Sequence, residues 1–530
     1  MFATHNLLTS FLDSTATRIP EALAARDADL SLSYGALRDA AAHIAARLAA
    51  HGVTAGDRVI LAMPNSVAFM AGFWGIITTG AIAVPLNPGT PCGKFAFILE
   101  DCTPAAAIAD ASTADVLRRA MEASGRDLPL LADNLLARGA SGRSAPAWPA
   151  PQVIDQDMAA IIYTSGSTGT PKGVMLTHLN MTSAARSVAS YLGYCSGDTI
   201  FCAVPMTFDY GLHQITMAAL TGASVYAADG FAQPLFALRQ LARSRASVFP
   251  VVPSMVPMIA PLADRFDLRS VRLATSTAAA LHPQSIDQLQ AALPAASVFS
   301  MYGLTECHRC TYLPPALLET HRGSVGIAIP NTEMWVVDDD GVAHRRGATG
   351  ELVIRGATVM KGYWNNPEAT ALRLRPGPNP GERVLYTGDT CRLDADGFLY
   401  FVARNDDILK IRGEKVAPSE VETALIAHPD VVEICALGEK HAVHGQICVA
   451  HLSLRNGSGV DVETLLGWAR AHLDPHAVPS RIIIHETMPR TPNGKLDRAG
   501  LRDRSASSGD RPVRPSRPAR PAVPDVAPAE

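Results

Sequence analysis

The sequence has no excess of basic residues and no regular array of cysteines. Its 46 lysines and arginines are outnumbered by 50 aspartates and glutamates, giving a net charge of -4. Nucleic-acid-binding proteins usually need a basic surface, so this balance argues against a nucleic-acid partner. The nine cysteines are odd in number and irregularly spaced. This pattern favours a reducing compartment over a disulfide scaffold.

Signals for export or membrane insertion are weak as well. The first residues, Met1-Phe-Ala-Thr-His-Asn, lack the basic and apolar regions of a signal peptide. Residues 66–85 carry no charge, and this length is near the ~20 residues that a membrane span needs. Three glycines and two threonines interrupt the stretch, and prolines close it. A buried helix followed by a buried strand explains it better, so we expect no membrane span and a cytoplasmic protein.

The length of 530 residues predicts more than one domain, because single cores stop growing near ~250–300 residues. Alternating helical and strand patterns over residues 1–135 and again from 159 predict parallel sheets in two βα-layered subdomains. Short strands with turns over 323–400 predict a β-rich subdomain. The clearest predicted elements are helices over 37–48, 178–192, 419–427 and 462–471, and strands over 59–63, 159–163, 201–205, 248–252, 272–276 and 298–301.

These patterns predict an α/β protein. Residues 1–404 should form a large N-terminal domain of two βα-layered subdomains plus a small β-rich subdomain. Residues 405–504 should form a small α+β C-terminal domain. The tail, residues 505–530, is rich in Ser, Pro and Arg and has no apolar periodicity, so we expect it to be disordered.

Residues 163–178 read Tyr-Thr-Ser-Gly-Ser-Thr-Gly-Thr-Pro-Lys-Gly-Val-Met-Leu-Thr-His. Glycines let backbone N–H groups turn towards an anion, the hydroxyls add donors, and Lys172 adds a positive charge. This chemistry suits a triphosphate. The stretch is not a Walker A loop, because Pro171 precedes the lysine and Gly173 stands where a magnesium-binding hydroxyl is required. It also lacks the glycine spacing of a Rossmann dinucleotide loop.

This stretch resembles the phosphate loop of the adenylate-forming (AMP-dependent synthetase/ligase) superfamily, which includes acyl-CoA synthetases and adenylation enzymes. Four further stretches match the superfamily in the same order along the chain. They are Met301-Tyr-Gly-Leu-Thr-Glu306, Tyr386-Thr-Gly-Asp389 with Arg404, the charged turns of residues 406–416, and Arg490-Thr-Pro-Asn-Gly-Lys495-Leu-Asp-Arg498.

The resemblance implies a nucleotide site for ATP and Mg²⁺. In the family, the residue matching Tyr302 packs on adenine beside Gly303, Thr305 contacts phosphate, and Glu306 ligates Mg²⁺. Asp389 and Arg404 then hold the ribose. The triphosphate cradle implied by the loop consists of Thr164, Ser165, Gly166, Ser167, Thr168, Gly169 and Lys172.

The C-terminal matches imply the thiol-transfer machinery. Lys495 corresponds to the lysine that reaches the carboxylate and the α-phosphate, where it meets charge that develops in the transition state. Asp406 corresponds to a hinge about which the small domain rotates. The turn of Gly413, Glu414 and Lys415 lines the channel for the thiol, which is coenzyme A or the phosphopantetheine arm of an acyl or peptidyl carrier protein.

The substrate pocket departs from the usual pattern. Relatives commonly carry glycines where this chain has Thr277 and Ala278, so we expect a narrower pocket. In Pro205-Met-Thr-Phe-Asp-Tyr-Gly-Leu-His213, Phe208 matches the gate of acyl-CoA synthetases, whereas Asp209 stands where amino-acid-activating domains bind an ammonium group. An Asp209 that faces the pocket favours an amino acid. One that caps the following turn favours a plain acid.

Residues 307–310 read Cys-His-Arg-Cys. A zinc site needs four ligands, and no second cysteine pair is evident, so His308 and Arg309 are better interpreted as lining the acyl tunnel. We expect an acyl-CoA synthetase that activates a fatty or aryl acid. The alternative is a stand-alone enzyme that loads an acyl or amino acid onto a separate carrier protein, since the chain has no Gly-x-Asp-Ser-Leu carrier motif. A nucleotide-binding protein without ligase activity is disfavoured by Glu306 and Lys495.

Overall fold

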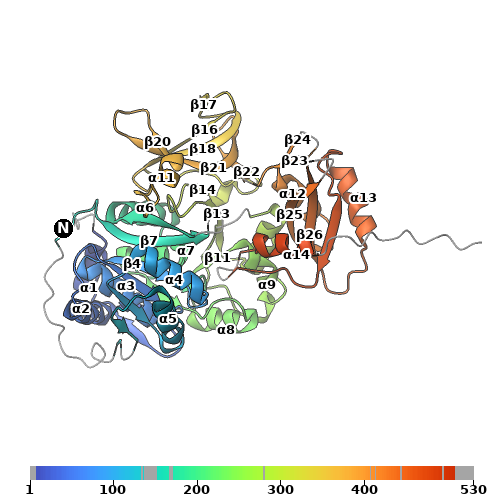
Figure 1. Ribbon diagram of the computed structural model, residues 1–530. Helices are drawn as coiled ribbons and strands as arrows, with labels where there is room; N and C mark the ends of the chain where they lie inside the picture. The colour runs from blue at the N-terminus through green and yellow to red at the C-terminus, as the bar shows by residue number, and fades with distance from the viewer. Residues whose placement is uncertain are drawn as a thin grey trace, which may run out of the picture.

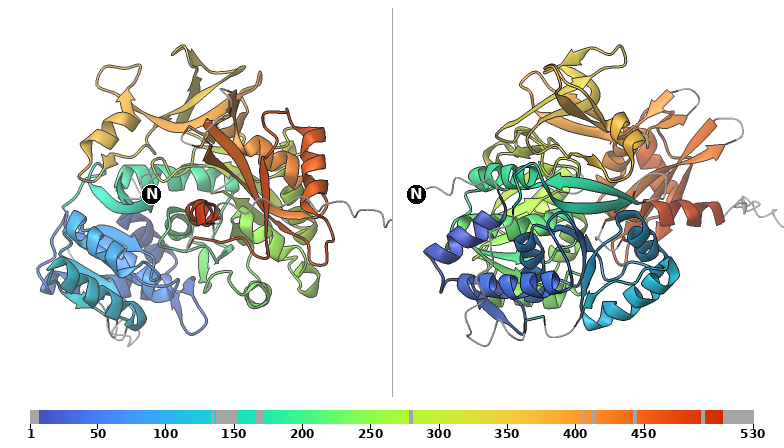
Figure 2. Two further views of the ribbon diagram at one scale, coloured as in Figure 1. Left: turned by 45° about the vertical axis from the view of Figure 1, so that its right-hand side comes forward. Right: turned by 60° about the vertical axis from the view of Figure 1, so that its left-hand side comes forward.

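The computed structural model describes residues 7–132, 135–136, 152–165, 171–277, 281–405, 407–411, 414–441, 445–491 and 495–507. Within these ranges the chain forms four β-sheets, three in a large N-terminal part and one in a smaller C-terminal part (Figures 1 and 2). The predicted α/β class, with two layered subdomains and a β-rich one, is confirmed.

The largest sheet is mostly parallel and carries helices on its connections. Its strands, in order across the sheet, are β15 (Ile327–Ala328), β14 (Thr311–Leu313), β13 (Ser297–Tyr302), β12 (Leu273–Ser276), β11 (Val248–Val251), β9 (Thr199–Cys202), β10 (Ser224–Ala227), β1 (Leu23–Arg26) and β2 (Ser31–Ser33). Because β12 and β13 are parallel and pair Ser276 with Ser300, Thr277 and Tyr302 follow at the same edge. Ligands of parallel sheets bind at this edge.

The second sheet ends in an antiparallel extension that contains the phosphate-loop hairpin. Its strands, in order, are β19 (Gly362–Tyr363), β8 (Pro171–Thr177), β7 (Met158–Ser165), β4 (Ile82–Leu86), β3 (Arg58–Ala62), β5 (Ala106–Ala109) and β6 (Leu130–Leu131).

Alternation along β3 explains how the second sheet is covered on both faces. Val59 and Leu61 belong to the main core, which also contains the central strands of the first sheet. Ile60 and Ala62 belong to a separate core with α4 (Cys92–Cys102) and α5 (Ala111–Ser124). The other helices of the large part are α1 (Thr9–Arg18), α2 (Tyr34–Ala50), α3 (Val67–Thr79), α6 (His178–Leu192), α7 (Asp209–Thr221), α8 (Pro234–Ser244), α9 (Val256–Ile259), α10 (Pro283–Ala292) and α11 (Pro367–Arg373).

The β-rich sheet and the C-terminal sheet complete the fold. The β-rich sheet is antiparallel and contains β17 (Ala343–His344), β16 (Thr332–Val337), β18 (Ala348–Gly356), β21 (Arg383–Leu393), β20 (Leu374–Pro376) and, beside β21, β22 (Leu399–Arg404). The C-terminal part contains β24 (Glu414–Val416), β23 (Leu409–Ile411), β26 (Gly445–Leu454), β25 (Val431–His441) and β27 (Arg481–His485), with helices α12 (Pro418–Ile426), α13 (Val462–His472) and α14 (Arg498–Ser507).

The apolar stretch of residues 66–85 is a buried helix followed by a buried strand, as predicted. Helix α3 begins after Ser66, whose hydroxyl accepts a hydrogen bond from the Phe69 N–H, and it ends at Gly80 with φ 79°. Strand β4 then follows and is buried throughout. Among the described residues, no helix combines the length and apolar character that crossing a bilayer requires.

The structure shifts one predicted strand and adds one helix. The strand predicted over 201–205 lies at β9 instead, because its pairing with β10 ends at Cys202. Helix α14 was not predicted and extends to Ser507, past the predicted start of the tail at 505. Residues 508–530, predicted to be disordered, lie outside the described residues.

Candidate active site

Tyr302, Asp389 and Arg404 meet at the junction of two sheets, although they come from three strands. Asp389 on β21 pairs in register with Arg404 on β22. The Tyr302 hydroxyl donates a 2.5 Å hydrogen bond to Asp389 Oδ2, and Arg404 Nε donates a 3.2 Å bond to Oδ1. Burial raises the pKa of Asp389, which is 2% exposed, and Arg404 and the Tyr302 hydroxyl act against this rise. The three predicted nucleotide residues therefore form one cluster.

A sharp turn carries the chain from Tyr302 to Glu306. A Cβ on Gly303 would lie 2.3 Å from the His308 carbonyl oxygen, so only glycine allows this close return. The Cys310 N–H donates to the Tyr302 carbonyl and closes the turn. Thr305 is buried within it. The turn brings Glu306 back towards the phosphate-loop hairpin.

Glu306 is held by Tyr363, a residue that the sequence patterns did not indicate. The Tyr363 hydroxyl donates a 2.7 Å hydrogen bond to Glu306 Oε1. Tyr363 lies on β19, which pairs with β8, and Lys172 Nζ lies 5.6 Å from the centre of the Tyr363 ring. Burial and, next, the Glu306 carboxylate raise the pKa of Tyr363, so its hydroxyl stays a donor. The dipeptide Gly362-Tyr363 gave no distinctive signal, since several other glycine–aromatic pairs occur in the sequence.

The phosphate-loop hairpin has the predicted strand before it and a helix after it. Strand β7 returns as β8, with Thr164 opposite Lys172. The Thr164 hydroxyl donates to the Lys172 carbonyl at 3.5 Å. Helix α6 starts after Thr177, which forms a capping box with Asn180. The predicted phosphate contacts Gly166, Ser167, Thr168 and Gly169, and the side chain of Ser165, lie outside the described residues.

Lys495 reaches the large part from the C-terminal part. Its turn is fixed by a 2.8 Å hydrogen bond from the Thr491 N–H to the Lys495 carbonyl. The Lys495 ammonium lies 4.9 Å from the centre of the Phe208 ring, a distance suited to a cation–π contact. Burial lowers the pKa of Lys495, and the nearby carboxylates of Asp209 and Glu306 act against this fall. The structure thus brings Lys495 to the predicted substrate gate.

Asp209 lies in this same region, and the Tyr210 N–H of the following turn also hydrogen-bonds its carboxylate. It is the first residue of α7, and the N-cap residue Phe208 makes no side-chain cap. Asp209 is 4% exposed, and its Oδ2 lies 3.6 Å from Nη1 of Arg309. Burial raises the pKa of Asp209, with Arg309 and then Lys495 opposing the rise. Gly211 allows the tight start of α7, since a Cβ there would lie 2.2 Å from the Pro205 carbonyl oxygen.

Several buried polar groups around Asp209 have no hydrogen-bond partner among the described residues. Neither ring nitrogen of His308 or His213 is bonded, and the two rings lie 5.6 Å apart. Burial lowers the pKa of His308 to about 3, and it lowers that of His213 well below the usual value, so both rings are neutral near pH 7. The hydroxyls of Thr277 and Ser276 are also unbonded. His213 was not predicted as a site residue, and Ala278 lies outside the described residues.

The predicted thiol-channel and hinge residues are only partly described. Glu414 is exposed on β24, which forms a hairpin with β23. Lys415 lies on the same strand, but its side chain, and Gly413 and Asp406, fall outside the described residues. The adjacent Asp407 accepts a 2.8 Å hydrogen bond from Arg502 of α14.

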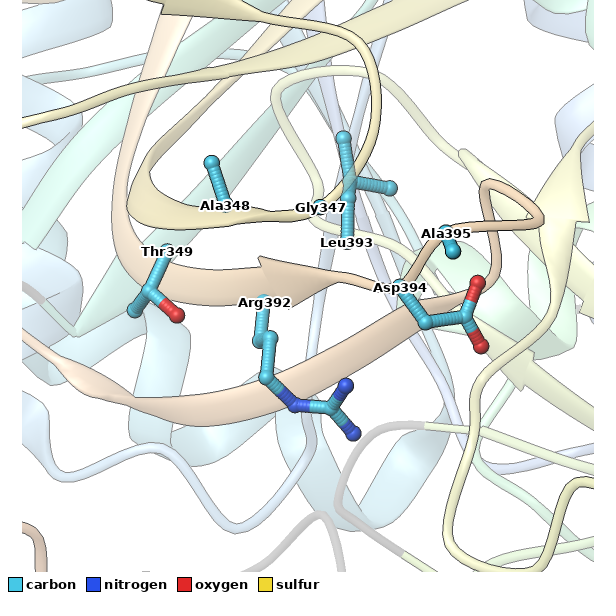
Figure 3. Close-up of a pocket in the computed structure, with 7 residues that line it drawn as sticks. All are labelled: Gly347, Ala348, Thr349, Arg392, Leu393, Asp394 and Ala395. Carbon is cyan, nitrogen blue, oxygen red and sulfur yellow. The ribbon is translucent and has the colours of Figure 1, made fainter.

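The hollow drawn in Figure 3 is separate from these residues. It measures about 330 Å³ and lies between β18 and the end of β21. Its lining contains no predicted site residue, and we assign it no role. The lining residues are Gly347, Ala348, Thr349, Arg392, Leu393, Asp394 and Ala395.

Comparison with known proteins agrees with this geometry. Residues 12–364 match the family described as AMP-binding enzyme, and residues 420–495 match the AMP-binding enzyme C-terminal domain. The chain belongs to the AMP-binding enzyme family. It is therefore an enzyme of the adenylate-forming, AMP-forming ligase class that the sequence motifs resemble. The two matched regions contain the phosphate-loop hairpin, Tyr302 and Glu306 and, at the far end, Lys495, whereas Asp389 and Arg404 lie between them.

Three relatives of this AMP-binding enzyme illustrate the similarity. The 4-coumarate–CoA ligase 1 of Solanum tuberosum is 31% identical over 484 residues, which cover 86% of this chain and 86% of the relative. ATP-bound MatB from Rhodopseudomonas palustris superposes with a TM-score of 0.84 at 27% identity, covering 94% of this chain and 99% of that one. The structure of VinN is 34% identical with a TM-score of 0.66, covering 74% and 98%.

Proposed function

We propose that this AMP-binding enzyme joins a small polar carboxylic acid to a thiol in two steps. In the first, a carboxylate oxygen attacks the α-phosphorus of ATP, and pyrophosphate leaves as acyl-AMP forms. In the second, a thiolate attacks the acyl carbonyl, and AMP leaves as the thioester forms. The observation that carries the proposal is the reach of Lys495 from the C-terminal part to the ring of Phe208.

The nucleotide would be held by the two clusters described above. Asp389 would accept hydrogen bonds from the ribose hydroxyls, and Arg404 would donate to them. Tyr302 would pack beside adenine. Lys172 and the hairpin hydroxyls would hold the phosphates that depart. In phosphoryl-type transfers the protein contributes positioning and charge neutralisation rather than covalent steps. This division of roles requires no nucleophilic side chain.

Lys495 would act where charge develops. Attack on the α-phosphorus spreads negative charge over its oxygens, and a cation fixed in a buried site stabilises such charge strongly. Thr305, buried in the turn before Glu306, would donate to the same phosphate. The carboxylates of Asp209 and Glu306 act against the lowering of the Lys495 pKa by burial, and thus favour its cationic form.

The donor set around Glu306 fits Mg²⁺. This ion is usually held by one or two carboxylates together with substrate phosphates and water, so a single glutamate beside the phosphate hairpin is sufficient. Glu306 would be the protein ligand, and Tyr363 would orient it. When bound, the ion would neutralise phosphate charge. The described residues contain no cluster of three or more His, Cys, Asp or Glu side chains that could hold a metal without phosphate.

The surroundings of Asp209 favour a polar acid over the fatty or aryl acid expected from the sequence. A plain hydrocarbon chain would leave Oδ1 of the buried Asp209 and the unbonded nitrogens of His213 and His308 without partners. Buried polar groups without partners are costly. The contact between Asp209 and Arg309 supports an Asp209 that faces the pocket, the orientation that favours an amino acid. We therefore include an amino group on the substrate in the proposal.

Coenzyme A is the proposed thiol, because relatives such as the 4-coumarate–CoA ligase of Solanum tuberosum carry that activity in their names. The phosphopantetheine arm of a separate carrier protein is the alternative. Thioester formation with coenzyme A, compared with a purified carrier, separates the two.

Exchange of labelled pyrophosphate into ATP tests the first step. We expect exchange that depends on an added acid, tested over a panel of fatty, aryl, dicarboxylic and amino acids with Mg²⁺ present. Lys495→Ala should remove the exchange. Absence of exchange with every acid would sink the proposed ligase activity.

A further inference from the structure

Arg309 is a buried guanidinium whose hydrogen-bonding capacity is largely unused. It is 2% exposed, and its Nη1 donates a 2.7 Å bond to the His308 carbonyl. Its Nε and Nη2 have no partner among the described residues. A guanidinium carries five N–H donors in a fixed fork. Most N–H groups of Arg309 therefore have no acceptor among the described residues, although the side chain is buried away from water.

Asp209 does not satisfy this guanidinium. The contact between Asp209 Oδ2 and Arg309 Nη1 is 3.6 Å, which is too long for a hydrogen bond. Asp209 Oδ1 has no partner either. Buried charges normally form close, bidentate pairs, because desolvation is otherwise not repaid. The two side chains are therefore not closely hydrogen-bonded to each other, and both Asp209 and Arg309 can form hydrogen bonds with a third group.

The guanidinium is nevertheless held firmly. Its plane lies over the ring of Tyr210, 4.6 Å from the ring centre. The Tyr210 hydroxyl is fixed in turn by the carbonyl and the hydroxyl of Thr275, at 2.8 and 2.7 Å. An arginine stacked on an aromatic face keeps its edge free for hydrogen bonds. Packing thus fixes Arg309 from one side and leaves its Nε–Nη2 edge unbonded.

Apart from Asp209, the unbonded polar groups of this region supply no anion for the free edge of Arg309. The imidazoles of His213 and His308 supply no anion, and their nitrogens are themselves unbonded among the described residues. Thr277 is also buried with an unbonded hydroxyl. These groups can complete a polar lining, but none of them carries the negative charge that a buried guanidinium requires.

The location connects Arg309 with the reaction. It lies three positions after Glu306 in the sequence, and it faces Asp209, whose neighbour Phe208 contacts Lys495. An acid whose reacting carboxylate reaches Lys495 would direct its opposite end towards the Asp209–Arg309 pair.

We propose that Arg309 is a specificity-determining residue that binds a second carboxylate of the substrate, while Asp209 takes its amino group. The substrate class is then an amino dicarboxylic acid of which one carboxylate is adenylated. This inference rests on the proposed function and narrows it. This substrate class accounts for the unused hydrogen-bonding capacity of both residues. The second carboxylate of an amino dicarboxylic acid would bind Arg309, and its ammonium group would bind Asp209.

A matched panel of acids in the pyrophosphate exchange assay tests the inference with the unaltered enzyme. The panel pairs short amino dicarboxylic acids with their side-chain amides, and dicarboxylic acids with the corresponding monocarboxylic acids. A site built for a charged group rejects an analogue that lacks it, here by about 100-fold or more in kcat/KM. Equal or better exchange with the amides or the plain monocarboxylic acids would overturn the inference while leaving the ligase activity intact. No exchange with any acid would instead overturn the proposed function.

Arg309→Gln adds a test of the residue itself, with Arg269→Gln as the control because Arg269 is exposed and pairs with Asp267 at the surface. We expect kcat/KM to fall about 100-fold for the dicarboxylic substrate and no more than about threefold for its amide. If Arg309 had only a structural or nucleotide-binding role, Arg309→Gln would lower kcat/KM equally for both substrates or raise the KM of ATP. Either result would overturn the assignment. Asp209→Asn with Arg309→Gln removes both charges together. If Arg309→Gln does not fold, the double variant should likewise lose the preference for the dicarboxylic acid over its amide.

Discussion

The Tyr363 hydroxyl donates a 2.7 Å hydrogen bond to Glu306 Oε1, and this bond joins the phosphate-loop hairpin to the carboxylate proposed for Mg²⁺. The Lys361 N–H donates to the Met175 carbonyl, so β8 and the segment containing Tyr363 are tied together by their backbones. A carboxylate that accepts such a bond is restrained in orientation before any ligand binds. Tyr363 is therefore a positioning residue rather than a catalytic one.

Removal of this hydroxyl should weaken the response to Mg²⁺. For Tyr363→Phe we expect the Mg²⁺ concentration for half-maximal exchange to rise about tenfold, since groups that orient a metal ligand contribute about 10–100-fold to affinity. The rate at saturating Mg²⁺ should change little. Exchange measured over a range of Mg²⁺ concentrations checks this. Tyr400→Phe is the matched control, because Tyr400 stacks with Arg392 away from the site. An unchanged Mg²⁺ dependence would contradict the role of Tyr363.

Lys495 should matter for one half-reaction only. In Lys495→Ala we expect adenylation to fall by about 100-fold or more, because a buried cation at a developing charge is lost. Thiol transfer from supplied acyl-AMP should stay within about threefold, since the small domain is proposed to rotate about Asp406 and withdraw Lys495 before that step. Pyrophosphate exchange and thioester formation are measured separately. The control is Lys440→Ala, at an exposed position of β25. Equal loss in both half-reactions would refute domain alternation.

The hydrogen bond between Tyr302 and Asp389 should contribute to ATP affinity. Tyr302→Phe keeps the ring but leaves the buried Asp389 carboxylate with Arg404 as its remaining side-chain partner. A hydrogen bond to a charged group is worth about 1.5–3 kcal/mol. Part of this should appear as an increase of roughly tenfold in the KM of ATP. Steady-state kinetics with ATP and the acid varied in turn check this expectation. A change confined to the KM of the acid would place Tyr302 outside the nucleotide site.

Much of the fold could be predicted from the sequence, because in those segments the local sequence patterns agree with the tertiary structure. The apolar runs at 159–163 and 298–301 became β7 and β13. Asp389 and Arg404 were predicted to act together, and a β-hairpin register indeed places them opposite each other. In each case the residues that meet are near in sequence or belong to a strongly patterned motif.

Contacts between distant segments were not predictable in the same way. Tyr363 belongs to a strand of two residues, which is too short to leave a periodic signal. The approach of Arg309 to Asp209 depends on how the turn after β13 packs against α7, and no spacing in the sequence encodes this. Helix α14 is mainly polar, so its sequence could not be distinguished from that of the polar tail. In the structure, Arg498 at its start pairs with Glu422 of α12 at 2.6 Å. Such contacts are set by tertiary packing rather than by propensity.

The buried histidine His308 should make stability depend on pH. Burial lowers its pKa from 6.5 to about 3, so the folded state binds fewer protons than the unfolded state between these values. Stability therefore rises with pH in this window, is complete above pH 6.5, and is lost as the pH falls towards 3. At pH 5 the loss from this one group is about 2 kcal/mol, since each pKa unit corresponds to about 1.4 kcal/mol.

Replacement of the imidazole by an amide tests this linkage. His308→Gln should flatten the fall of the unfolding free energy between pH 7.5 and 5, measured by urea denaturation, by about 2 kcal/mol. Some slope should remain, because burial also lowers the pKa of His178, to about 4. His51→Gln, at an exposed position at the end of α2, serves as the control and should follow the unaltered protein. Parallel pH profiles for His308→Gln and the unaltered protein would show that His308 is accessible to protons in the folded state, and that the polar lining around Arg309 is open to water.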